Sequence, residues 1–256
     1  MNAKENIKFF WNERANTFDD SFGHGIHSER ENKAWKNLFN NISNNKESVV
    51  LDMGCGTAEI SKILSGIYKK IYGLDFAPNM VKLAKDKVLQ NSLTNVEIIE
   101  GDATNPIFDD NKFDIIFARH LLWTIPKPKE TLNKWKNLLK KDGILIISDG
   151  NWQEKSLKKT FLTKLSNLIK TMTQKKDPED EFGNKFLNYY DDIYKKFDYP
   201  SGLKEEQTIE ILKGLGFKNI NSYDISEIIK AQKASAPLYF KVLDRKCGRY
   251  TISASF

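Results

Sequence analysis

The sequence holds few of the residues on which cysteine and histidine chemistry depends. Its 256 residues include two cysteines, Cys55 and Cys247, too few for a disulfide framework or a cysteine-rich zinc site. It also holds three histidines, His24, His27 and His120. These lack the helical spacing and the nearby carboxylates of a metal site, so we expect no metal centre.

Long apolar runs are also missing. No stretch approaches the roughly 18 uninterrupted apolar residues of a membrane span. The N-terminal residues lead into a charged helical pattern without the apolar core of a signal peptide. We therefore expect a cytoplasmic protein with no membrane span. The formal net charge of +6 would allow binding to nucleic acid or a membrane surface, but a lysine-rich solvated surface explains it more simply.

What the chain has instead is a regular alternation of short apolar runs and helical patterns. This alternation predicts a Rossmann-like α/β fold, with seven strands in a mostly parallel sheet and helices on both faces. Ligands of such sheets bind at the edge formed by the carboxyl ends of the strands. The expected strands are 48–52, 70–75, 96–100, 113–118, 144–149, 218–225 and 238–244, and the expected helices between them include 58–65, 78–90, 129–139 and 205–215.

The same patterns divide the chain into four segments. We expect an N-terminal helical lid at 1–45, containing helices at 5–20 and 29–42, and a core at 46–150. A helical cap insertion follows at 151–203, and 204–256 completes the core sheet. The cap holds an amphipathic helical stripe and a stretch with seven lysines and no acid, which we interpret as a solvated polar face. The stripe consists of Leu157, Phe161, Leu165, Leu168, Ile169 and Met172, and the lysine-rich stretch is 155–176.

A glycine-rich loop lies between the first expected strand and its helix. Gly54 and Gly56 allow the backbone to turn sharply and to approach a ligand closely. The preceding acid, Asp52, would repel a pyrophosphate but could accept hydrogen bonds from an ammonium group. A nicotinamide-binding loop would need a third glycine where the chain has Glu59.

Two more acids follow the next strands. Asp75 closes the second expected strand, at the position that takes ribose hydroxyls in dinucleotide-binding folds. Asp102 follows the third strand. Acids after three successive strands form an edge suited to a cationic, ribose-bearing ligand with an adenine amino group.

Together these residues resemble a known family. The segments 49–58, 101–103 and 113–120, with Asp75, resemble class I S-adenosylmethionine-dependent methyltransferases. The segment 119–126 further resembles the branch of small-molecule and quinone-type methylases. The resemblance covers 48–150 well and implies S-adenosylmethionine as cofactor and S-adenosylhomocysteine as product.

The resemblance also implies a set of cofactor contacts. Gly54, Gly56 and Arg119 would contact the methionine part, and Asp52 would hold its amino group through water. Asp75 would hold the ribose. The adenine would lie against Phe76, Asp102 and Ala103. The family often has a third glycine where this chain has Ala58, which is a mild change at a helix start.

Motifs do not name a catalytic base, because methyl transfer from a sulfonium needs mainly alignment and desolvation of the nucleophile. His120 and His24 are candidates for a base or for orienting the acceptor, or they are structural residues. Trp11, Trp123 and Tyr190 are candidates for the wall of an acceptor pocket, the alternative being the core of the cap.

A small-molecule acceptor is the preferred interpretation. Amino-directed nucleic-acid methyltransferases typically carry an Asn/Asp-Pro-Pro-aromatic run after the fourth strand, where this chain has Ala-Arg-His-Leu at 118–121. Nucleic acid is therefore disfavoured. A peptide or protein acceptor stays open, as does a non-catalytic protein that only binds S-adenosylmethionine.

Overall fold

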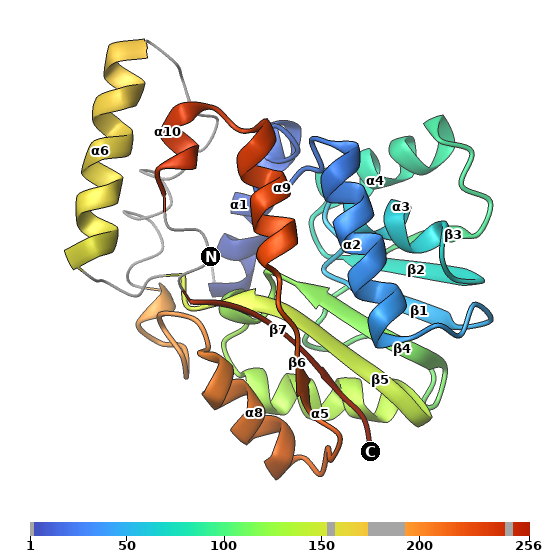
Figure 1. The fold of residues 1–256 in the computed structure, drawn as a ribbon. Coiled ribbons are helices and arrows are strands. Elements are labelled where there is room, and N and C mark those ends of the chain that lie inside the picture. The colour runs from blue at the N-terminus through green and yellow to red at the C-terminus, as the bar shows by residue number, and fades with distance from the viewer. Residues whose placement is uncertain (1–2, 153–156, 174–192, 244–247) are drawn as a thin grey trace.

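The computed structural model describes residues 3–152, 157–173, 193–243 and 248–256 (Figure 1). Within these ranges one sheet has the strand order β3-β2-β1-β4-β5-β7-β6. The first five strands in this order are parallel, whereas β7 runs antiparallel to both of its neighbours. The prediction of a seven-stranded, mostly parallel Rossmann-like sheet is confirmed. The strands are β1 (Val49–Met53), β2 (Lys70–Asp75), β3 (Val96–Glu100), β4 (Phe113–Arg119), β5 (Leu139–Gly150), β6 (Asn221–Ser222) and β7 (Arg249–Ala254).

Helices cover both faces of this sheet (Figure 1). Successive side chains of a strand point to opposite faces, so Val50 packs into one core cluster and Leu51 into the other. Near-continuous apolar strands are what a doubly covered sheet requires. One face carries α2 (Glu29–Ile42), α3 (Glu59–Ser65), α4 (Pro78–Gln90) and α9 (Ser226–Ser235), and the other carries α5 (Pro128–Leu138) and α8 (Glu205–Gly214).

The C-terminal part differs from the sequence prediction. The strand expected at 218–225 is reduced to the two residues of β6, and the segment expected to form the last strand is the short helix α10 (Leu238–Lys241). Pro237 directly precedes α10, where its fixed φ suits a helix start. A short apolar run does not by itself distinguish a strand from a buried helical turn. The last strand of the sheet is β7, every residue of which is at least half buried.

Two longer helices of the described residues lie outside these layers, together with the short α10. The first, α1 (Ala3–Phe18), packs on α4. The second, α6 (Leu157–Thr173), packs on α10 and stands away from the sheet (Figure 1). In the described part of the chain, no helix combines the length and apolarity needed to cross a bilayer.

Candidate active site

A cavity lies where the carboxyl ends of β1, β2 and β4 meet α1. It has a volume of about 80 Å³, well below the roughly 300 Å³ or more that is usual for small-molecule pockets. Its walls include ten of the residues singled out from the sequence: Trp11, His24, Asp52, Gly54, Gly56, Asp75, Phe76, Ala103, Arg119 and His120.

The glycine loop forms the floor of this cavity. Gly54 has a φ of +69°, and a Cβ there would lie 2.9 Å from Leu121 Cδ1, so only glycine fits without rearrangement. The N–H groups of Gly54 and Cys55 donate to the Leu74 carbonyl at 2.8 and 3.0 Å, which fixes the loop to the end of β2. Ala58, at the third-glycine position, also has a left-handed φ of 66°.

Two carboxylates line the cavity beside the loop. Asp52 is 2% exposed and accepts a hydrogen bond from Ser61 Oγ at 2.6 Å. Asp75 accepts from the N–H groups of Gly56 and Ala77, both at 2.9 Å. Burial raises the pKa of each carboxyl to about 6. Because a carboxylate can accept about four hydrogen bonds, Asp75 keeps acceptor capacity for a ligand.

Asp102 does not line the cavity. Its carboxylate accepts from Lys4 Nζ of α1 at 2.5 Å, and from the Thr104 N–H and hydroxyl at 2.8 and 2.7 Å. Burial of Asp102 opposes ionisation, but these hydrogen bonds outweigh it, so its pKa is lowered. The neighbouring Ala103 does reach the cavity, and its carbonyl accepts from Trp135 Nε1 at 2.7 Å.

Arg119 closes β4 and brings a positive charge to the cavity. Its Nη2 donates to the His24 carbonyl at 2.6 Å, which holds the turn after α1 against the sheet. Its Nη1 is buried and has no hydrogen-bond partner among the described residues. Burial lowers the pKa of Arg119 from its usual value, an effect that Glu31 and Asp52 oppose. The guanidinium thus has a donor without a partner among the described residues, and its charge interacts with the Asp52 carboxylate.

The two candidate histidines come together at the cavity. Their ring centroids are 5.7 Å apart, and His24 also lies 4.5 Å from the ring of Phe18. His120 has a φ of 54°, an uncommon conformation for a residue with a side chain. Its ring meets Trp152 edge-on at 4.6 Å, and its carbonyl accepts from Trp123 Nε1 at 2.8 Å.

The remaining pocket candidates lie elsewhere. Trp123 does not line the cavity but packs between Trp11 and Tyr194, at 6.1 and 5.5 Å between ring centroids. Tyr190 lies outside the described residues. The cavity wall also holds residues that the sequence analysis did not select as site residues, because a lone side chain without reactive chemistry carries no motif: Phe18, Ile60, Leu74, Met80, Leu121 and Thr124.

Asp149 supports the site from behind. Its carboxylate accepts from the Leu122 N–H at 2.7 Å, and from the Gly150 N–H and Trp152 Nε1, both at 2.8 Å. Burial raises its pKa to about 6. One acid at the end of β5 therefore positions both the segment after His120 and the indole that touches its ring.

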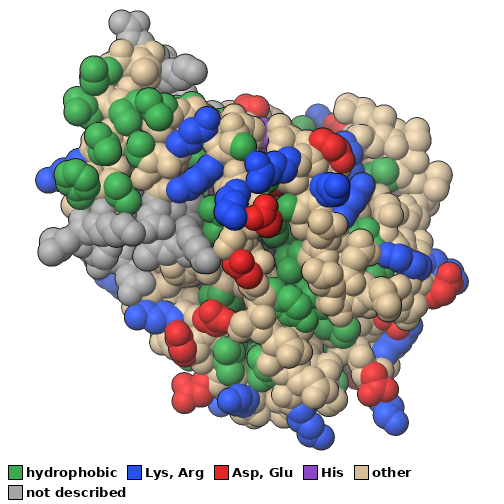
Figure 2. All heavy atoms as spheres, in the orientation of Figure 1, with side chains coloured by type: hydrophobic (Ala, Val, Ile, Leu, Met, Phe, Trp, Pro, Cys, Tyr) green, Lys and Arg blue, Asp and Glu red, His purple; other side chains and the backbone are tan. Residues whose placement is uncertain are grey.

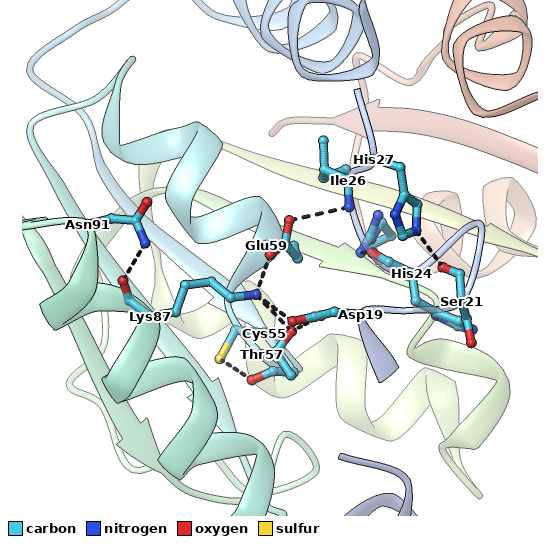
Figure 3. A network of polar contacts seen from close by, with 12 residues as sticks. Asp19, Ser21, His24, Ile26, His27, Cys55, Thr57, Glu59, Lys87 and Asn91 are labelled. Atoms are coloured by element: carbon cyan, nitrogen blue, oxygen red, sulfur yellow. Dashed lines mark hydrogen bonds and ion pairs between the residues drawn. The ribbon is translucent and has the colours of Figure 1, made fainter. Parts of the chain in front are cut away.

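A network of polar contacts fastens the end of α1 to the glycine loop (Figure 3). Asp19 accepts from Thr57 Oγ1 at 2.5 Å and from Lys87 Nζ at 2.8 Å. Lys87 also pairs with Glu59 at the start of α3. Next to this network the ring of Phe18 covers Gly56, where a Cβ would lie 3.3 Å from Phe18 Cε1. The N-terminal segment thus forms one wall of the cavity.

A family model described as a methyltransferase domain matches residues 44–201, which is more than half of the chain. The chain belongs to this methyltransferase-domain family. The resemblance inferred from the glycine loop and its acids is confirmed. The matched residues include all the cavity-lining positions except those of α1 and of the turn that follows it.

Two more comparisons, one with a curated protein and one with a solved structure, show what this methyltransferase-domain chain is similar to. It is 34% identical over 125 residues to a demethylmenaquinone methyltransferase of Staphylococcus epidermidis, covering 47% of this chain and 51% of that protein. It thus spans about half the length of the curated relatives it matches. A solved S-adenosylmethionine-dependent methyltransferase from Aquifex aeolicus has the same fold, with a TM-score of 0.55, 17% identity, and coverage of 99% and 97%.

Proposed function

We propose that this chain transfers a methyl group from S-adenosylmethionine to a small-molecule acceptor. The observation that carries the proposal is a pair of cavity-lining carboxylates, the buried Asp52 and the partly buried Asp75, beside a glycine loop in a methyltransferase-domain chain. The demethylmenaquinone methyltransferases among its relatives support a quinone-type or similar small acceptor.

The cavity residues fit the cofactor. Asp75 has spare acceptor capacity for ribose hydroxyls, and Asp52 offers a carboxylate to an ammonium group. The unused Nη1 donor of Arg119 suits the carboxylate of an amino acid. Gly54 and Gly56 leave the backbone open to the ligand, and Phe76 and Ala103 provide apolar contacts at the adenine end. When bound, S-adenosylmethionine supplies a methyl group on a sulfonium, which is already an activated leaving group.

The chain's own residues would align the acceptor and exclude water. The apolar side chains of Trp11, Phe18 and Leu121 line the cavity, which suits desolvation of a nucleophile. His24 and His120 also line the cavity, and an imidazole can hold or accept a proton near neutral pH. We infer that one of them orients the acceptor or takes its proton.

We also infer that residues 1–45 act as a lid. A cavity of about 80 Å³ is too small for a nucleoside-bearing ligand. Because α1 and Phe18 close it, their displacement is the direct route of entry. Asp102 would reach the cofactor only after releasing Lys4.

A labelling experiment tests this function. The chain is incubated with methyl-deuterated S-adenosylmethionine and a panel of quinols, phenols and amines, and the products are analysed by mass spectrometry. We expect enzyme-dependent deuteromethylation of a small molecule. Label on a peptide in an added extract would overturn the acceptor class. Tight binding of S-adenosylhomocysteine without any transfer would favour a non-catalytic binding protein.

A further inference from the structure

The outer face of α6 and α10 carries an unusual concentration of exposed apolar side chains. Phe161, Leu168 and Met172 of α6 are 66%, 57% and 76% exposed, and Leu238 of α10 is 61% exposed. Of the seven large exposed apolar residues in the described ranges, these four lie on two helices in contact. Figure 2 shows the apolar atoms gathered on this projecting part of the molecule, with lysines beside them.

The three exposed apolar side chains of α6 share one face of that helix, and this is not the face that packs against α10. Phe161, Leu168 and Met172 are spaced by seven and four residues, so they project on the same side. The helix is held by another side: Ser166 is buried, and Ile169 packs against the cluster of Tyr239 and Phe240. The stripe therefore points outward although α6 is attached to the molecule.

Every charged residue of the two helices that carry these apolar side chains, α6 and α10, is a lysine. The 17 residues of α6 contain four lysines and no acid. Lys164 is exposed one helical turn before Leu168, and Lys241 is exposed on α10. An apolar stripe on helices whose charged residues are all lysines is typical of helices that lie on anionic lipid surfaces.

We propose that the α6–α10 face docks on an anionic lipid bilayer. Phe161, Leu168 and Met172 would enter the boundary between headgroups and acyl chains, and the lysines would neutralise lipid phosphates. A second copy of the chain fits less well, because it would bring two acid-free, lysine-bearing helices together. The side chains project from a convex surface, which suits insertion into a soft interface better than docking on a folded partner.

Vesicle flotation with the full chain tests the proposal. The wild type is mixed with vesicles of phosphatidylcholine alone or with one quarter phosphatidylglycerol. We expect binding to the anionic vesicles to be at least about tenfold stronger than to the neutral ones, and to weaken in 0.5 M salt. The variant F161S/L168S/M172S should bind anionic vesicles about tenfold or more weakly than the wild type, and K164E should weaken this binding by a smaller factor.

A matched control uses the apolar residues exposed elsewhere. Leu89 and Ile107 are 76% and 75% exposed, so L89S/I107S removes two comparably exposed apolar side chains away from the proposed face. This control should bind vesicles like the wild type. Circular dichroism and S-adenosylhomocysteine binding check that every variant is folded, and neither readout depends on vesicles.

Four results would overturn the proposal. The wild type could fail to float with anionic vesicles, or the stripe variant could float as well as the wild type. The control could lose as much binding as the stripe variant. Finally, wild-type chain that is retained by immobilised polyglutamate but not by vesicles would identify an acidic protein surface as the partner. The proposal does not rest on methyl transfer, so none of these results bears on the proposed reaction.

Discussion

Asp75 connects the glycine loop to the second strand and offers its carboxylate to the cavity. Two backbone N–H groups occupy part of its acceptor capacity and keep it in place. The carboxylate is therefore oriented before a ligand arrives, which reduces the entropy lost on binding. Its replacement should affect the ligand more than the fold.

We expect Asp75→Asn to weaken S-adenosylhomocysteine binding by roughly 10- to 100-fold, because a charge-assisted hydrogen bond contributes about 1.5–3 kcal/mol. Isothermal titration calorimetry measures the change. Glu97→Gln, on an exposed position of the neighbouring strand, is the control and should bind like the wild type. Equal affinity of Asp75→Asn and the wild type for S-adenosylhomocysteine would show that Asp75 does not bind the cofactor.

Asp52 links stability to pH. Burial raises its pKa to about 6, whereas an unfolded chain has a value near 4. Asp52 therefore binds its proton more tightly in the folded state than in the unfolded state. The free energy of unfolding that the neutral carboxyl contributes is lost as the pH rises from about 4 through 6. Above that range the folded protein holds a buried carboxylate at a cost in free energy.

Asp52→Asn removes this titration. Relative to the wild type, we expect the variant to gain on the order of 2 kcal/mol in free energy of unfolding between pH 4.5 and pH 7.5. Urea unfolding of both proteins at the two pH values measures this difference. A difference that does not change with pH would show that Asp52 has an ordinary pKa in the folded state.

At the scale of elements, α1 forms one wall of the cavity and would have to move if it acts as the proposed lid. Its N-terminal half is attached by exposed ion pairs, Lys4 to Asp102 and Lys8 to Glu100. Its C-terminal end is attached by Phe18 over the glycine loop and by the network of Asp19. Exposed ion pairs contribute about 0–1 kcal/mol each, so the first attachment opens more easily than the second.

We expect Lys4→Ala/Lys8→Ala to speed S-adenosylhomocysteine association by about two- to fivefold and to change the fold little. Stopped-flow fluorescence measures the rate, since Trp11 lines the cavity. Lys127→Ala, which breaks the exposed Lys127–Glu130 pair, is the control and should leave the rate unchanged. Unchanged association in the double variant would mean that the N-terminal half of α1 does not limit entry.

At the scale of the whole molecule, the last residues of the chain complete a sheet that begins near residue 49. The strand β7 pairs antiparallel with β5 from Ala254 to Arg249 and also pairs with β6. Its residues Tyr250, Ile252 and Ala254 belong to the core cluster under α5 and α8. Without β7, β5 would become an exposed apolar edge.

We expect a chain ending at residue 247 to be insoluble or to lack a cooperative unfolding transition. Soluble yield and thermal melting followed by circular dichroism measure this. Removal of Phe256 alone, which stacks on Phe217 at 4.6 Å, should lower the melting temperature but leave the fold intact. A soluble truncated chain with the wild-type melting temperature would contradict the role assigned to β7.

The sequence by itself determined the core sheet from the first strand to β5 and the composition of the cavity floor. These depend on local signals: apolar runs, glycines at left-handed turns and acids at strand ends, all of which act within a few residues. Gly54, Asp52 and Asp75 could therefore be assigned to one edge before their distances were known.

The tertiary structure decided what depends on contacts between distant segments. The pairing of β7 with β5 and the covering of Gly56 by Phe18 arise from packing between residues far apart in sequence. The same holds for the stripe of α6. Periodicity places its apolar residues on one face, but only the position of α10 determines that Ile169 docks the helix and Phe161 faces outward. The apolar periodicity of a helix specifies which residues share a face, and the elements packed around the helix decide whether that face is buried or exposed.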